Sequence, residues 1–406
     1  MLYKDGLIVS TKTFEGHKVG FKMKQNELSD EVYKKRFKPN KEDMRGVFFR
    51  DQTAIVHSFP FRRLKRKTQV FFAPDNDHIC TRIEHVLHVF TNSTTISKGL
   101  IEKGWKLNIE MVQAIALGHD VGHAPFGHAG EEVLNEIVEK ETKGVNSFHH
   151  EINSLRFVDY IAEKGEGLKL TFGVRDGIVS HCGESVEKEQ FIEPDWEVRK
   201  LEEIDELDKY PASYEGCIVR VADKISSLGR DMEDAIRLKI INDDEIPNDV
   251  LEYLEVKSSE ARDQFNRALL KKIIYDIRDT TDSTREVGMS DNGFKCIKEI
   301  NEFSKKNIYE ADKIKNYKIY VEVILGNLYD SLSKLFDKYE FNIESYERCF
   351  IRSYKEFGRY LSAYKEFYRK SDTDKTQILV DYISGMSDNY AIKFSTDISI
   401  PKTVFK

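Results

Sequence analysis

The seventeen residues 116–132, ALGHDVGHAPFGHAGEE, restrict the fold more than any other stretch of this sequence. An apolar run with helical spacing leads into His119 and Asp120, and Pro125 and Gly127 then interrupt the helix. A second apolar stripe of the same period follows at 133–138. The pattern predicts two helices joined by a break that carries an aspartate and three histidines, which are His119, His123 and His128.

The spacing of the histidines and acids within this stretch suggests how they are arranged. His123 follows His119 by four residues, or one helical turn, so we expect the two rings on one helix face. Glu131 follows His128 by three residues, which allows its carboxylate to orient the imidazole. His119 and its neighbour Asp120 can converge on one ion only where the helix ends.

Helical spacing of apolar residues recurs elsewhere in the chain. Stripes run through 109–116, 152–161 and 218–228, and only 8 Pro and 23 Gly occur in 406 residues. The segment from about 240 to 370 is charged, helical in pattern and rich in Tyr and Phe, which we attribute to helix–helix packing. We therefore predict a mainly α fold.

Composition excludes several classes of protein. The 63 basic and 70 acidic residues give a net charge of -7, which argues against a chain that binds nucleic acid over its whole surface. No run approaches the ~18 apolar residues of a membrane span, and the N-terminus does not resemble a secretion signal. The absence of C-x-x-C and the odd number of cysteines favour a reducing, cytoplasmic environment, with the thiols at Cys80, Cys182, Cys217, Cys296 and Cys349.

Histidine placement indicates a site. Eight of the 11 histidines fall between residues 78 and 150, among carboxylates, and imidazole with carboxylate is a common ligand set for divalent metals. Further along, Asp223, Ser227 and Asp231 recur every four residues on an otherwise apolar helix. A buried acid without a partner costs on the order of a few kcal/mol, so Asp223 requires a cation. A metal satisfies this need, and Lys224 or Arg230 is the alternative partner.

The order His85, His119-Asp120, Asp223 resembles that of the HD-domain metal phosphohydrolases. Longer blocks, spread from residue 50 to near the C-terminus, resemble in order those of the deoxynucleoside-triphosphate triphosphohydrolases, the group that includes the bacterial dGTPases. The blocks are FRRLKRKTQVF (61–71), TRIEHVLHV (81–89), GHDVGHAPFGHAGE (118–131), FHHEINSL (148–155), GIVSHCGE (177–184), VRVADKISSLGRDMEDA (219–235) and DYISGMSDNYA (381–391).

The resemblance implies a helical HD-type core at about 50–236, with helical elaborations at about 237–406, in one domain over residues 1–406. It implies one divalent metal ion, Mn, Mg, Fe or Co, in a site with open positions. The implied ligands are His85, His119, Asp120 and Asp223.

The resemblance also implies a reaction and its residues. Hydrolysis at the α-phosphorus of a dNTP would release a deoxynucleoside and inorganic triphosphate. His128, oriented by Glu131, would act as general acid, while His123, His150 and Arg82 would contact the phosphates. The expected substrate-binding residues also include the sugar contacts Gln69 and Asp231, together with Ser227 and Lys224.

Expected partners follow from the same resemblance. Members are commonly homo-oligomers, often tetramers or hexamers, and an activating nucleotide or single-stranded DNA is a candidate partner for the basic run RRLKRK at 62–67. His181 and Glu184 are assigned mainly to support of the site. Two alternatives stay open: an HD-type phosphodiesterase or nucleotidase acting on another nucleotide, and a non-catalytic regulator that binds nucleotide or nucleic acid.

Overall fold

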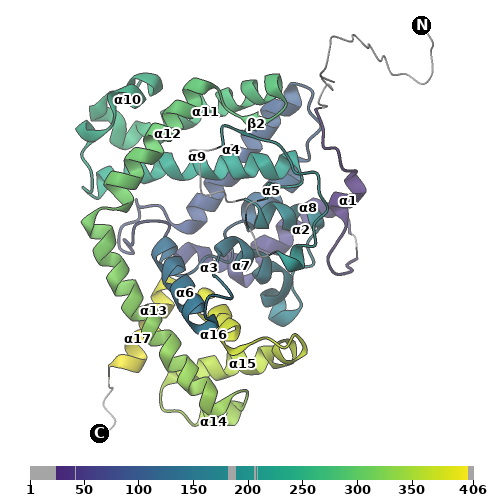
Figure 1. Ribbon diagram of the computed structural model, residues 1–406, viewed down its shortest axis with the longest axis vertical. Helices are drawn as coiled ribbons and strands as arrows, with labels where there is room; N and C mark the ends of the chain where they lie inside the picture. The colour runs from purple at the N-terminus through teal and green to yellow at the C-terminus, as the bar shows by residue number, and fades with distance from the viewer. Residues whose placement is uncertain (1–23, 42, 182–188, 205–206, 208, 401–406) are drawn as a thin grey trace, which may run out of the picture.

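The computed structural model describes residues 24–41, 43–181, 189–204, 207 and 209–400. Within these ranges nearly all of the regular secondary structure is helical, so the predicted mainly α fold is confirmed (Figure 1). Two short antiparallel strands, β1 (Phe191–Ile192) and β2 (Val287–Gly288), form its small sheet. The helices are α1 (Asp30–Lys34), α2 (Val47–His57), α3 (Phe59–Arg63), α4 (Arg82–Glu102), α5 (Ile109–Gly118), α6 (Gly127–Thr142), α7 (His150–Arg156), α8 (Phe172–Val179), α9 (Tyr214–Arg237), α10 (Asn248–Leu254), α11 (Ala261–Thr284), α12 (Asp291–Ser304), α13 (Asp312–Tyr339), α14 (Ile343–Glu347), α15 (Arg352–Lys370), α16 (Lys375–Ser384) and α17 (Asp388–Ser399).

One hydrophobic core lies among α2, α4, α5, α8, α9 and α11. α9 packs against α4, α5 and α11, and in Figure 1 these helices occupy the upper half of the molecule. Local sequence fixes where they begin: the Ser213 hydroxyl accepts a hydrogen bond from Gly216 N at the start of α9, and the Asn108 side chain does the same for Met111 N at α5. This core therefore aligns three of the helices that carry predicted site residues.

A second hydrophobic core joins α6 to the C-terminal helices. Val133, Leu134 and Val138 of α6 are buried against α13 and α16, and Figure 1 shows the long α13 crossing α6 in the lower half. Many of the aromatic residues attributed to helix packing lie in this core, Tyr346, Phe357 and Tyr368 among them, whereas Phe265 lies in the first core. The break after α5 thus leads the chain from the first core into the second.

The prediction that His119 and His123 share a helix face is wrong. α5 ends at Gly118, and residues 119–122 form turns instead of another helical turn. Gly122 explains the departure: its backbone lies so close to α7 that an added Cβ would meet Ser154 N at 2.2 Å. Gly122 N also donates to Ser154 Oγ at 2.9 Å, so the chain leaves the helix to pack on α7.

The connection ends in a strained residue. Phe126 adopts a left-handed conformation with φ 68°, which non-glycine residues rarely do, and α6 starts directly after it. The Asp388 carboxylate at the start of α17 accepts hydrogen bonds from Phe126 N at 2.8 Å and from Thr68 N at 2.7 Å. A residue far away in the sequence thus stabilises the turn that presents His128.

Two further expectations from the sequence concern membrane spans and cysteines. Within the described part of the chain, no helix is both long and apolar enough to cross a membrane. Cys80, Cys217, Cys296 and Cys349 are free thiols there. Cys182 and Glu184 lie outside the described residues.

Candidate metal centre and active site

Three helices or their ends bring the four predicted metal ligands together. His85 lies in the first turn of α4, His119 follows the end of α5, and Asp223 lies in the middle of α9. His85 Nε2 is 2.9 Å from Asp223 Oδ1, and His119 Nε2 is 3.8 Å from the same oxygen. Asp120 Oδ2 is 3.7 Å from His119 Nε2. Nitrogens and oxygens of the predicted quartet therefore surround one small volume.

The hydrogen bonds of His119 suit it to metal binding. Its Nδ1 donates to the carbonyl oxygen of Ala116 at 2.7 Å, which leaves the lone pair on Nε2. That Nε2 atom is buried and has no hydrogen-bond partner. Burial is the main cause that lowers the pKa of His119 to about 4, so the ring is neutral at pH 7. A neutral imidazole with an unpaired buried nitrogen fits a divalent cation.

The acids of this centre are held in their charged form. Burial opposes ionisation of Asp223, yet its hydrogen bond with His85 and the neighbouring rings hold the pKa of its carboxyl below the ordinary value. For Asp120 burial is again the largest influence, and the Arg82 guanidinium overcomes it, so its pKa lies well below the usual range. Both carboxylates are negative at neutral pH, as cation ligands must be.

Arg82 is tied to this centre and to a neighbouring loop. Its Nη1 donates to Asp120 Oδ2 at 2.5 Å, while Nε and Nη2 donate to the carbonyl oxygens of Thr68 and Gln69 at 3.2 and 3.1 Å. The guanidinium is buried. In this arrangement Arg82 neutralises Asp120 and positions the loop that carries Gln69.

A second group of ionisable side chains surrounds Glu131. Its Oε1 lies 2.8 Å from His150 Nδ1 and also accepts a hydrogen bond from His150 N at 2.8 Å. His123 Nε2 lies 3.4 Å from Glu131 Oε2, and His128 Nδ1 lies 3.8 Å from the same oxygen. The predicted pairing of Glu131 with His128 is thus the longest of its three imidazole contacts, because α7 places His150 closer.

Residues 82–228 match the HD domain family. Over most of the chain the protein is similar to deoxyguanosinetriphosphate triphosphohydrolase-like proteins from three bacteria. The identity is 32% for Clostridium tetani, covering 93% of this chain and 92% of the relative. It is 31% for Caldanaerobacter subterraneus, covering 90% and 88%, and 33% for Desulfatibacillum aliphaticivorans, covering 88% and 89%.

The chain belongs to the deoxyguanosinetriphosphate triphosphohydrolase-like family of HD-domain proteins. It is therefore a member of a family of metal-dependent phosphohydrolases. The donor set of the centre agrees with this membership, since two imidazoles and two carboxylates converge around the unpaired His119 Nε2.

The expected substrate-binding residues of this family member lie on α9 and on the loop before α4. Asp231 is buried and accepts a hydrogen bond from Tyr309 OH at 2.7 Å. Gln69 is buried, and its Oε1 atom has no hydrogen-bond partner. Ser227 Oγ donates to Lys224 O at 3.0 Å, and Lys224 Nζ lies 3.6 Å from Glu189 Oε2. Gln69 Oε1 is thus an acceptor still available to a ligand.

Sequence reasoning missed several residues of the site. Lys67, which it treated only as part of a basic run, is buried and donates to the carbonyl oxygens of His123 and Ser384. Burial lowers the pKa of Lys67 to about 7. Tyr309, the partner of Asp231, comes from the aromatic-rich segment that was attributed to helix–helix packing. A lysine that ends a basic run and a tyrosine among many give no local signal of these contacts.

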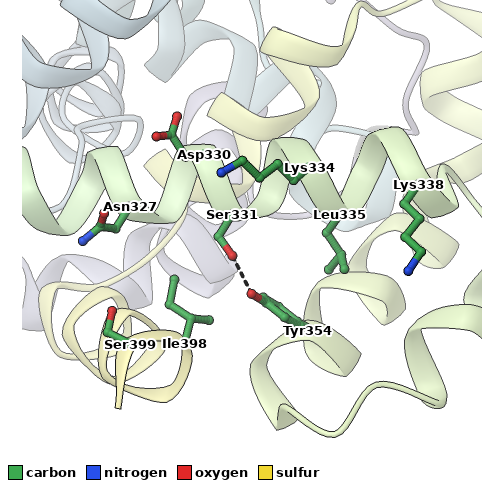
Figure 2. A pocket seen from close by; sticks show the side chains of 9 residues that line it. All are labelled: Asn327, Asp330, Ser331, Lys334, Leu335, Lys338, Tyr354, Ile398 and Ser399. Carbon is green, nitrogen blue, oxygen red and sulfur yellow. Dashed lines mark hydrogen bonds between the residues drawn. The ribbon is translucent and has the colours of Figure 1, made fainter. Parts of the chain in front are cut away.

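A separate hollow lies between α13, α15 and α17, with a volume of about 450 Å³ (Figure 2). Ser331 Oγ and Tyr354 OH are hydrogen-bonded at 2.5 Å across it, and Lys334 and Lys338 lie on its rim. It shares no residue with the histidine-rich centre.

Proposed function

We propose that the protein hydrolyses deoxynucleoside triphosphates at the α-phosphorus and releases a deoxynucleoside and inorganic triphosphate. The observation that carries the proposal is the unpaired Nε2 of His119, surrounded by His85, Asp120 and Asp223 and adjacent to the group around Glu131. The names of the relatives support a nucleotide triphosphate as substrate.

His85, His119, Asp120 and Asp223 would hold the divalent cation, for which Mn, Mg, Fe and Co are all suitable. When bound, the cation supplies positive charge to the phosphate and lowers the pKa of an attacking water molecule. The chain contributes the geometry: the hydrogen bond from His119 Nδ1 to Ala116 O keeps Nε2 available as a ligand.

His128 is the proposed proton donor to the 5′-oxygen that leaves. Its side chain is 63% exposed, so a substrate could reach it from solvent. Glu131 orients it from 3.8 Å and holds His150 more tightly, and His150 with His123 would line the path of the phosphates. Arg82, already on Asp120, adds positive charge on that side.

Sugar recognition is assigned to Gln69 and Asp231, with Ser227 and Lys224 on the same face of α9 as further substrate contacts. The free Gln69 Oε1 and the Tyr309–Asp231 pair support hydrogen bonding to a hydroxyl group. We also propose that the chain forms one functional unit, assembles as a tetramer or hexamer, works in the cytoplasm, and binds a regulatory nucleotide or single-stranded DNA at its basic segment.

A product assay tests the proposal. Purified protein is incubated with Mn²⁺ or Mg²⁺ and each dNTP and NTP, singly and in mixtures, and products are separated by ion-exchange chromatography. We expect nucleoside and triphosphate from the wild type, with at least a ~10²-fold lower rate for Asp223→Asn, which keeps the shape of a ligand and removes its charge.

Other products redirect the assignment. Monophosphate or diphosphate would indicate the phosphodiesterase or nucleotidase alternative. Binding without turnover in every mixture would indicate a regulator. Exposed His78→Ala is the matched control and should retain the wild-type rate.

A further inference from the structure

The long helix α13 carries apolar side chains on two sides. Val321 and Leu325 face the second core and are fully buried. Three large apolar side chains within five residues project instead to solvent, which marks an interaction surface more often than a single exposed one does. They are Ile319, Tyr320 and Val323, with exposed fractions of 56, 70 and 57%. In Figure 1, α13 lies along the outer edge of the lower half of the molecule, where another protein can reach it.

The exposed apolar residues belong to a stripe that runs along α13 and that we call the outer face. An α-helix turns by about 100° per residue, so a set of positions between 312 and 334 lies within about 60° of the direction of Val323. The outer face consists of Asp312, Asn316, Ile319, Tyr320, Val323, Gly326, Asn327, Asp330 and Lys334. Its centre is apolar and its ends are polar or charged, as in the core and rim of a protein–protein interface.

The centre of the outer face is complementary to itself. When two copies of α13 run antiparallel about a two-fold axis at Val323, each residue lies opposite the one equally far beyond Val323 in the second copy. Val323 then meets Val323. Ile319 and Tyr320 of one copy lie against Gly326 and Asn327 of the other, so large side chains meet small ones. Gly326 has no atom within 4 Å of an added Cβ, which leaves this space to the second copy.

The ends of the outer face match in charge in the same arrangement. Asp312 and Lys334 both lie eleven residues from Val323, so the antiparallel copies bring them together twice. Asn316 and Asp330, both seven residues away, form a second pair in which the amide donates to the carboxylate. Within the described part of the chain, Asp312, Asp330 and Lys334 form no ion pair. A parallel arrangement would instead oppose Asp330 to Asp330.

We propose that a second copy of this chain packs on the outer face, with the two α13 helices antiparallel about a two-fold axis at Val323. The matched charges select this occupant and this direction, because each copy supplies both members of every pair. The inference specifies one interface of the proposed assembly and does not depend on the hydrolytic reaction.

Sedimentation velocity of the full-length protein, over a range of concentrations, tests the interface. Val323→Glu places two like charges on the axis and should halve the mass of the assembly. The side chain is exposed in the single chain and glutamate is a good helix former, so the fold should persist, which circular dichroism checks. Val145→Glu changes another exposed valine, away from α13, and should leave the mass unchanged.

Two further variants test the antiparallel direction. The axes of packed helices lie ~8–10 Å apart and Cα atoms lie about 2.3 Å from each axis, so the two Val323 Cα atoms approach within about 6 Å, which a disulfide spans. Val323→Cys should therefore cross-link to its own copy under mild oxidation, and Val145→Cys should cross-link no more than the wild type. Lys334→Asp should weaken the assembly, and adding Asp312→Lys to it should restore the wild-type mass.

The outcomes separate this interface from the other proposals. An oligomer whose mass is unchanged by Val323→Glu overturns the interface and leaves the proposed assembly intact. A monomer at every concentration overturns both and leaves the outer face to a different partner. A double variant that stays as weak as Lys334→Asp overturns the antiparallel arrangement. None of these results bears on hydrolysis, which the product assay measures separately.

Discussion

Asp231 shows at the scale of a single residue how a position proposed to bind the sugar costs stability. Burial raises the pKa of its carboxyl from 3.8 to about 6, and the hydrogen bond from Tyr309 only partly opposes this effect. An acid whose pKa is higher in the folded state loses stability as pH rises from about 4 through 6, because the folded protein must then bury the charge.

We expect Asp231→Asn to stabilise the protein at alkaline pH. Asparagine retains an acceptor for Tyr309 and removes the charge. The free energy of unfolding should rise by about 3 kcal/mol at pH 8 and by about 1.5 kcal/mol at pH 5, following the raised pKa. Urea unfolding at the two pH values, with metal removed, measures the difference. An equal gain at both pH values would show that charge burial is not the cause.

At the scale of elements, the connection between α5 and α6 depends on Gly122 because this residue has no side chain. Gly122 is packed on the backbone of α7, whereas Gly326, inside α13, has nothing within 4 Å of an added Cβ. A Gly→Ala substitution therefore has no space for its methyl group at residue 122 and free space at residue 326.

Gly122→Ala should destabilise the protein by about 3 kcal/mol or more, because α7 must move away. It should also lower kcat, since the same connection carries Asp120 and His123. Gly326→Ala should stabilise the protein by up to about 1 kcal/mol through helix propensity. Thermal unfolding of both variants checks the pair. A stable, active Gly122→Ala protein would contradict the packing seen here.

For the whole molecule, the C-terminal segment holds the loops of the candidate site in position. Asp388 accepts from Thr68 N and Phe126 N, and Lys67 donates to Ser384 O at 2.8 Å. The site lies where the two hydrophobic cores meet, because α4, α5 and α9 belong to the first core and α6 to the second.

Asp388→Ala should lower the free energy of unfolding by about 3 kcal/mol, since it leaves two buried backbone N–H groups without their acceptor. It should also reduce kcat more than it changes KM, because the loop with His128 loses its support. Asp374→Ala, which removes the exposed cap of α16, is the control and should cost only about 1 kcal/mol. Denaturant unfolding and steady-state kinetics separate these outcomes; equal losses in the two variants would remove the special role of Asp388.

Features that depend on local sequence could be predicted, whereas features that depend on contacts between distant segments could not. Helix periodicity located α5 and α9. The resemblance to the HD-domain phosphohydrolases anticipated that His85, His119, Asp120 and Asp223, which the structure brings together, belong to one site. Periodicity could not show that α5 ends early at Gly118, because the cause is the close packing of Gly122 against α7, which is distant in the sequence. The contacts of Lys67 and Tyr309 depend on tertiary packing between distant segments, for which local sequence carries no signal.

The burial of the ligand quartet has a consequence for the rate of metal exchange. His85, His119 and Asp120 are sealed from solvent, and only Asp223, with a side chain 18% exposed, opens toward water. A chelator can therefore approach a cation seated there from the side of Asp223, and a nucleotide would approach from the same side. Removal of the ion by a chelator should then slow when a nucleotide occupies the site.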